Sequence, residues 1–178
     1  MTNFPRPAVA GLLLACALIS AHAQNGNGLD NLDWVEEKEP PPPAFSKDRA
    51  LPLEMPNYVS VRVAIDPATV QVGNDGVVRY VVVMSNSTGS VNAMYEGIRC
   101  ASDQVKTYAR AGTSGEWNLV SNPAWRDLND NQPSRHAFVF ARMAACSVHV
   151  ANSQDVVLKA LKTQQKPRSA KFSNELGY

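Results

Sequence analysis

The chain has 178 residues, with 17 lysines and arginines, 16 aspartates and glutamates, and a formal net charge of +1. This balance of charge gives no overall attraction to nucleic acid or to an anionic membrane surface, so we expect nucleic acid not to be a partner. The length suits one domain once an N-terminal leader is removed.

Residues 1–23 have the pattern of a secretory signal peptide. Arg6 precedes an apolar run from Ala8 to Ile19, and the segment closes on small residues. A transmembrane helix would need about 20 apolar residues, so we predict cleavage between Ala23 and Gln24 and export to the periplasm. A second interpretation stays open, because the residues leading to Cys16 resemble a bacterial lipobox, which would leave the chain lipid-anchored through Cys16. Beyond Gln24 we expect no transmembrane segment.

Residues 24–57 have no sustained hydrophobic period and contain four consecutive prolines, Pro40 to Pro43. Proline lacks the backbone donor and favours extended backbone, so we predict a semi-rigid arm outside the core. The acidic stretch from Asp30 to Glu39 is typical of a solvated segment. Trp34 has two open interpretations: it folds back onto its own domain or it docks on a partner.

The region 58–163 has the pattern of an α+β domain. Tyr58 to Ala64 alternates and predicts a strand, Asp66 and Pro67 predict a turn, and the Asp-Gly pair within residues 73–76 predicts a tight hairpin. The β-branched run from Val77 to Met84 is typical of a strand buried on both faces, so we place it at the centre of the sheet.

Residues 91–100 alternate again, which puts Tyr95 and Gly97 on one face and Met94, Ile98 and Cys100 on the other. Strand-like segments at 104–110 and 116–120 follow. The sequence therefore predicts an antiparallel β-meander of about five strands, covered by one or two C-terminal helices.

The first of these helices is expected to begin near Pro133 and to turn Val139, Met143 and Cys146 inward; the second follows Ser153. The stretch SVHV between them has an alternative as an edge strand. Residues 164–178 are expected to form a flexible tail.

Cys100 and Cys146 remain once Cys16 leaves with the signal peptide. Two thiols in an oxidising compartment are expected to pair, so we predict a disulfide between helix and sheet.

Neither cysteine belongs to a C-x-x-C pair, and the histidines lack the spacing of a metal site. The sequence gives no motif for a metal or another cofactor.

Several stretches together carry a family resemblance: DPATVQVGNDGVVRY, YEGIRC, KTYARAG, the later Trp117 and Trp125, and a cysteine near the end of the domain. The chain resembles the cryptic neisserial protein family, small exported bacterial envelope proteins of unassigned activity. The resemblance implies a single domain, export to the periplasm and no catalytic residues. The segment FARMAACSVHV departs from the family pattern, which makes the predicted helix ending less secure than the meander.

Aromatic and basic residues gather on the later strands, as they do in recognition sites. The candidate binding residues are Arg99, Tyr108, Arg110, Trp117 and Trp125. The same rings would also serve as core, with the arginines reaching solvent or pairing with Glu96 and Glu116.

We therefore predict a non-catalytic binding or envelope-associated module, whose partner is an envelope protein or a small ligand. The alternative is a small hydrolase that uses His136 with Glu96 or Glu116. A histidine within hydrogen-bond reach of a carboxylate inside a cleft would favour this alternative.

Overall fold

The computed structural model describes residues 33–130 and 135–164. The predicted signal peptide with Cys16, the cleavage site at Ala23 and Gln24, and nearly all of the predicted tail lie outside the described residues. Within the described ranges, no helix combines the length and apolar character that crossing a membrane requires.

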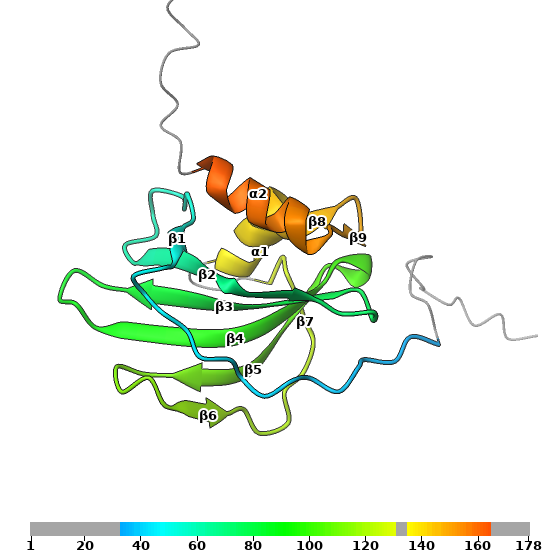
Figure 1. Cartoon of the computed structure of the whole chain (residues 1–178), viewed down its shortest axis with the longest axis horizontal. Helices are drawn as coiled ribbons and strands as arrows, with labels where there is room; N and C mark the ends of the chain where they lie inside the picture. Colours follow the sequence, from blue (N-terminus) through cyan, green and yellow to red (C-terminus); the bar gives the residue numbers. More distant parts are fainter. Residues whose placement is uncertain (1–32, 131–134, 165–178) are drawn as a thin grey trace, which may run out of the picture.

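A seven-stranded antiparallel sheet forms the body of the domain (Figure 1). Its main path runs, in chain order, through β1 (Leu51–Pro52), β2 (Arg62–Val72), β3 (Val77–Ser85), β4 (Val91–Arg99), β5 (Gln104–Ala111) and β6 (Trp117–Leu119), while β7 (Arg126–Asp127) also pairs with β5. Neighbours along the chain are neighbours in the sheet, so the predicted meander is confirmed.

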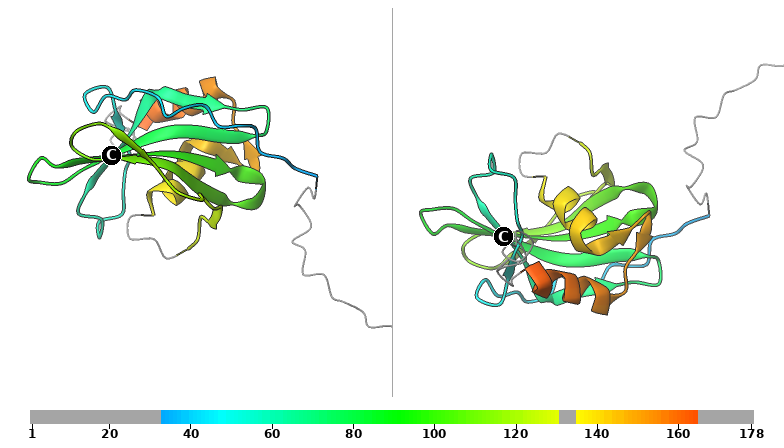
Figure 2. Two further views of the ribbon diagram at one scale, coloured as in Figure 1. Left: turned by 90° about the horizontal axis from the view of Figure 1, so that it is seen from below. Right: turned by 90° about the horizontal axis from the view of Figure 1, so that it is seen from above.

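The C-terminal elements gather on one side of this sheet (Figures 1 and 2). After the 3-10 turn η1 (Cys100–Ser102) and the later strands come α1 (His136–Phe140), the π-helical η2 (Ala141–Ala145), the short strands β8 (Cys146–Ser147) and β9 (Val150–Ala151), and α2 (Gln154–Gln164). The SVHV stretch thus contributes to a separate two-stranded hairpin. The α+β architecture with C-terminal helices is confirmed.

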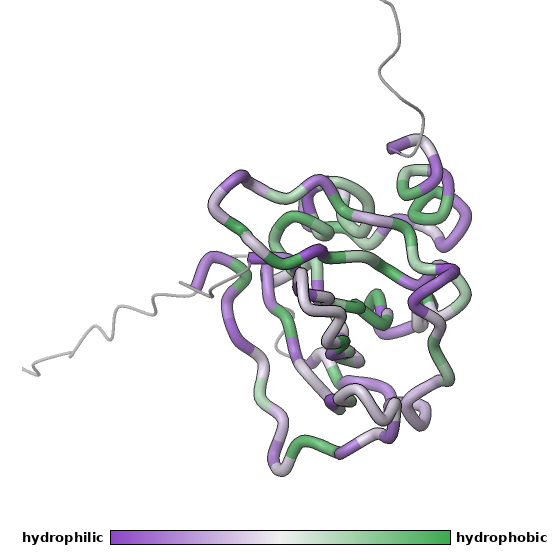
Figure 3. Tube along the Cα trace, turned by 90° about the vertical axis from the view of Figure 1, so that its left-hand side faces the viewer, coloured by the Kyte–Doolittle hydropathy of each residue, from purple (hydrophilic) through white to green (hydrophobic). Residues whose placement is uncertain are grey.

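Strand β3 is buried on both faces, as its β-branched composition predicts. Val78, Tyr80 and Val82 face a core that includes Phe140 of α1 and Leu161 of α2. On the other face, Val81 and Val83 join a second cluster with Tyr95 and Tyr108, against which Phe45 of the N-terminal arm packs. Along the strands, hydrophobic and hydrophilic residues follow one another closely (Figure 3). The sheet is therefore covered by the helices on one side and by the arm on the other.

The predicted turn at Asp66 and Pro67 is wrong. Strand β2 begins at Arg62 and continues through both residues, with an irregularity in its pairing to β3 between Asp66 and Gln71. The carboxylate of Asp66 is fully buried and accepts hydrogen bonds from Arg49 Nε and Nη2, each at 2.6 Å, and from the Ser46 amide at 2.8 Å. A bulge supported by the arm replaces the turn, because these donors satisfy a carboxylate inside the sheet.

The predicted inward stripe of the first helix is right only in part. Met143 and Cys146 are half-buried and pack against the core, whereas Val139 is half-buried and lies outside that cluster. The fully buried side is made by His136, Ala137, Phe140, Ala141, Ala144 and Ala145. The helix continues as a π-helix, whose wider turn displaces the side chains that follow from α-helical spacing. It ends before Cys146, which has extended backbone with φ −123° and ψ 145°.

The disulfide between Cys100 and Cys146 is confirmed, with the two Cα atoms 5.6 Å apart. It joins the segment that follows β4 to the start of the β8–β9 hairpin. Cys146 reaches Cys100 from extended backbone beyond the helical segment, so the link does not depend on a helical cysteine.

Candidate functional site

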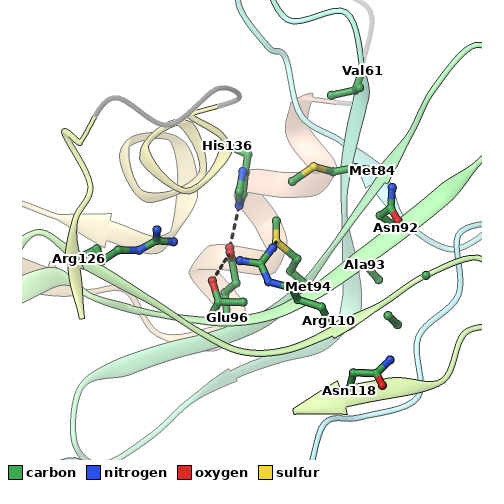
Figure 4. A pocket seen from close by; sticks show the side chains of 13 residues that line it. Val61, Met84, Asn92, Ala93, Met94, Glu96, Arg110, Asn118, Arg126 and His136 are labelled. Atoms are coloured by element: carbon green, nitrogen blue, oxygen red, sulfur yellow. Dashed lines mark hydrogen bonds and ion pairs between the residues drawn. The ribbon is translucent and has the colours of Figure 1, made fainter. Parts of the chain in front are cut away.

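A pocket of about 730 Å³ opens on the helix side of the sheet (Figure 4). Apolar and polar side chains share its wall. The lining residues are Val61, Met84, Asn92, Ala93, Met94, Glu96, Thr107, Arg110, Ala111, Gly112, Asn118, Arg126 and His136. They come from the sheet, the segments beside it and the start of α1, so the meander and the helix together build the pocket.

A buried acid and a buried histidine meet in this wall. Nε2 of His136 lies 2.8 Å from Oε2 of Glu96, and the two residues are 3% and 2% exposed. Strand β4 turns Glu96 inward between Met94 and Ile98, and the first residue of α1 supplies the imidazole. The side chains of Tyr80 and Thr107 donate further hydrogen bonds to Glu96, at 2.8 Å and 3.1 Å. All three neighbours satisfy a carboxylate that burial alone would disfavour.

The electrostatics of this cluster favour an ionised Glu96. Burial by itself raises the pKa of Glu96, but the electrostatic interaction with His136 and the hydrogen bonds from His136, Tyr80 and Thr107 outweigh it, so the pKa lies below its ordinary value. Burial and the adjacent negative charge raise the pKa of Tyr80 well above its ordinary value. Tyr80 therefore stays a neutral donor at physiological pH.

Two arginines extend toward this cluster from the pocket wall (Figure 4). Nη1 of Arg110 lies 3.0 Å from the sulfur of Met94. Arg126 is exposed at the short strand β7. Within residues 33–130 and 135–164, neither guanidinium forms an ion pair with a carboxylate.

The arm engages four of the five predicted binding residues on the opposite face of the sheet. The guanidinium of Arg99 stacks on Trp34, 3.9 Å from the ring centroid. Tyr108 and Trp125 donate to the carboxylate of Glu36, at 2.8 Å and 3.1 Å.

The fourth of them, Trp117, donates to the backbone oxygen of Pro43 at 3.0 Å. The fifth, Arg110, lies apart from the others and lines the pocket. Trp34 thus folds back onto its own domain. That these five residues bind a ligand or a partner stays a prediction.

Of the two alternatives for the arginines, Arg110 and Arg126 reach solvent, and Glu96 is buried and pairs with His136 instead. The acidic stretch before the prolines is exposed at Asp33, Glu37 and Glu39, as expected. Glu36 departs from this expectation, because it is half-buried and forms an ion pair with Lys106 at 2.7 Å.

For the alternative hydrolase, the structure brings His136 and Glu96 together, while Glu116 does not line the pocket. The burial of Glu96 had a signal in the sequence, because strand alternation puts it on the same face as Met94 and Ile98. Nothing local pointed to its partner, forty residues away. Among the residues that the structure describes, no group of three or more His, Cys, Asp or Glu side chains could hold a metal ion.

The fold and the site define a small disulfide-linked α+β domain with an amphipathic pocket beside a buried histidine–glutamate pair and an N-terminal arm bound across its sheet. A family model described as CNP1-like family matches residues 30–162. The chain belongs to this family, which confirms the resemblance seen in its motifs. Neither the curated proteins nor the solved structures contain a match to the chain.

Proposed function

We propose that the chain is an exported, periplasmic binding protein whose pocket holds a small ligand with an anionic group and an apolar body. The N-terminal pattern supports export, as does the disulfide, because such bonds persist in oxidising compartments. The mass of the protein isolated from cells tests this location: a chain that begins at Gln24 supports it, and an acylated chain that begins at Cys16 would instead place the protein on a membrane.

The observation that carries the choice of ligand is the imbalance of charge in the pocket. Its buried acid, Glu96, is already satisfied by His136, Tyr80 and Thr107. Arg110 and Arg126 have no carboxylate partner among the described residues. Both guanidinium groups are exposed where they line the pocket, and a guanidinium without a carboxylate partner can bind a carboxylate or phosphate through paired hydrogen bonds.

The rest of the wall suits an apolar body. Val61, Met84 and Met94 line the pocket, and methionine side chains adapt to ligands of irregular shape. Asn92 and Asn118 add amide groups that can orient a polar substituent. A cavity that combines apolar walls with a few polar groups is typical of small-molecule sites.

Displacement of a fluorescent probe tests this proposal. The probe 1-anilinonaphthalene-8-sulfonate combines an aromatic body with an anion, and decanoate is expected to displace it while the neutral decanol is not. Replacing Arg110 or Arg126 with glutamine should weaken decanoate binding by about tenfold, the loss expected for one charged hydrogen bond. Arg142→Gln, an exposed arginine outside the pocket, is the matched control. Equal binding of decanoate and decanol would overturn the proposal.

The buried pair favours a second candidate, a small hydrolase in which His136 acts as a base oriented by Glu96. The 2.8 Å contact beside a pocket is the observation that supports it. Against it, the two hydroxyl groups that contact the pair, on Tyr80 and Thr107, both donate to Glu96 and so support the acid. Turnover of chromogenic esters by the purified chain that disappears in His136→Gln, with the fold retained, would favour the hydrolase over the binding protein.

A further inference from the structure

The arm is attached to the sheet at two separate places. Trp34 and Glu36 form the first, and Pro43, Phe45 and Arg49 form the second. Residues 38–41 between them are exposed, and the arm itself forms no strand at either attachment. The first attachment can therefore open without loss of the second.

Beneath the first attachment lies a groove that we call the arm groove. It is formed by Asp75, Arg79, Arg99, Lys106, Tyr108 and Trp125. Its centre is a carboxylate site, since Oε2 of Glu36 accepts from Lys106 Nζ at 2.7 Å and from Trp125 Nε1 at 3.1 Å, while Oε1 accepts from Tyr108 Oη at 2.8 Å. Nη2 of Arg79 lies 3.8 Å from Oε1 of the same group.

An aromatic site lies next to the carboxylate site. The ring of Trp34 stacks under the Arg99 guanidinium and meets Trp125 edge-on, with the two ring centroids 5.9 Å apart. Its indole nitrogen donates to the backbone oxygen of Asp75 at 2.8 Å. Between Trp34 and Glu36, the side chain of Val35 points away and is 79% exposed. The groove thus contacts the side chains of two alternate residues of an extended segment, as peptide-binding sites commonly do.

The groove complements the charge of its occupant. Arg79 is only 3% exposed although it carries a full charge, and its partners are Asp75 at 2.7 Å and the backbone oxygen of Glu37 at 3.3 Å. The pKa of Tyr108 is raised by burial and by its hydrogen bond to Glu36, which keeps the hydroxyl a donor. Basic and donor groups therefore face the acidic residues of the arm.

We propose that the arm groove is a peptide-binding site for an extended segment in which a tryptophan precedes a glutamate by two positions, and that in an assembly its occupant is residues 33–37 of a second copy of this chain. A second copy carries a segment that already fits every group of the groove. Two chains that exchange residues 33–37 need no new contact. If residues 38–41 open, the first attachment forms between the two chains instead of within one. The groove lies on the face of the sheet opposite the pocket, so this proposal is independent of the proposed function.

Complementation between two variants tests exchange directly. Trp34→Ala disables the arm and leaves the groove, while Arg99→Ala with Lys106→Ala disables the groove and leaves the arm. Each variant alone is expected to stay monomeric at high concentration in sedimentation experiments, and the mixture is expected to form a heterodimer. Val35→Ala, whose side chain is exposed, is the matched control and should behave as the unmodified chain. Circular dichroism of each variant checks that it is folded.

A labelled peptide of residues 33–39 measures the groove separately, using a chain whose own arm is weakened by Trp34→Ala and Glu36→Ala. The peptide is expected to bind, and its Glu36→Gln form should bind about tenfold more weakly, because one charged hydrogen-bond acceptor is lost. Peptide binding without a heterodimer would overturn the second copy as occupant. Absence of both would overturn the proposal, since the arm would then be a permanent part of the fold.

Discussion

Nε2 of His136 lies 2.8 Å from Oε2 of Glu96, although the two residues are forty positions apart and belong to different layers of the fold. The contact ties the first residue of α1 to the middle of β4. It also supplies one of the donors that a buried carboxylate requires.

Replacing His136 with alanine is expected to lower the free energy of unfolding by about 3 kcal/mol, because Glu96 would remain buried with its charge unpaired. Urea titration at neutral pH measures this loss. Glu96→Gln in the same background should recover part of the stability, since a neutral amide costs less to bury. A double variant less stable than His136→Ala would contradict this account.

The same pair predicts sensitivity to acid. Because the pKa of Glu96 is lower in the folded chain than its ordinary value of 4.5, its ionised form stabilises the fold above that pH, and this contribution is lost as the pH falls through the folded value. The pKa values of Asp66 and Asp75 are also lowered: burial opposes the shift in each, and hydrogen bonds from Arg49 and Arg79 respectively outweigh it. Their effect has the same sign.

Urea midpoints measured from pH 7 to pH 3 should therefore be level at first and then fall below about pH 4.5. In Glu96→Gln the fall should be shallower, because one of the contributing carboxylates is absent. An identical slope in the two proteins would show that Glu96 does not contribute to acid unfolding.

Replacing Cys100 or Cys146 with serine should lower the free energy of unfolding by up to about 4 kcal/mol, since the unfolded chain loses a cross-link that closes a loop between residues 46 positions apart. Thermal unfolding of each variant measures the effect. The two single variants and the double variant should agree, because each removes the same bond. A free thiol in the unmodified, unreduced chain, detected by labelling after denaturation, would contradict the pairing.

Gly97, within the motif EGIRC, leaves room for the ring of Tyr108. A Cβ atom at this position would lie 2.6 Å from the Tyr108 hydroxyl and 2.8 Å from a methyl carbon of Val77. Gly97→Ala is therefore expected to cost about 1 to 3 kcal/mol of stability and to displace the hydroxyl that donates to Glu36.

Thermal unfolding checks the loss at Gly97, and tryptophan fluorescence reports whether the arm is displaced, since Trp34 lies in the arm and Trp117 and Trp125 contact it. Gly112→Ala, where a Cβ would meet nothing within 4 Å, is the control. An unchanged midpoint in Gly97→Ala would show that the ring of Tyr108 can move aside.

The sequence predicted the meander because its signals are local. Alternation marked β4, the Asp-Gly pair marked the hairpin between β2 and β3, and the β-branched run marked the central strand. The turn at Asp66 was wrong because an aspartate before a proline usually stays in water, whereas here Arg49 and Ser46 satisfy its carboxylate within a strand.

The site was harder to predict because it depends on contacts distant in the sequence. Alternation alone places Glu96 on the buried face, yet no local pattern connects it to His136. The attachment of Trp34 to Arg99 and Asp75 likewise requires the folded sheet. The change to a π-helix after Phe140, which alters the spacing of the side chains that follow, leaves no recognisable pattern in the sequence.

The central strand β3 is shielded by segments from opposite ends of the domain, the arm before it and residues 135–164 after it. During synthesis, the hairpins of the meander can pair as soon as they emerge, but one apolar side of the sheet must wait for the last helix. A chain interrupted before residue 135 would present that side to other chains and should associate with them. Residues 135–164 are thus the part of the chain that keeps this side of the sheet from associating with other chains.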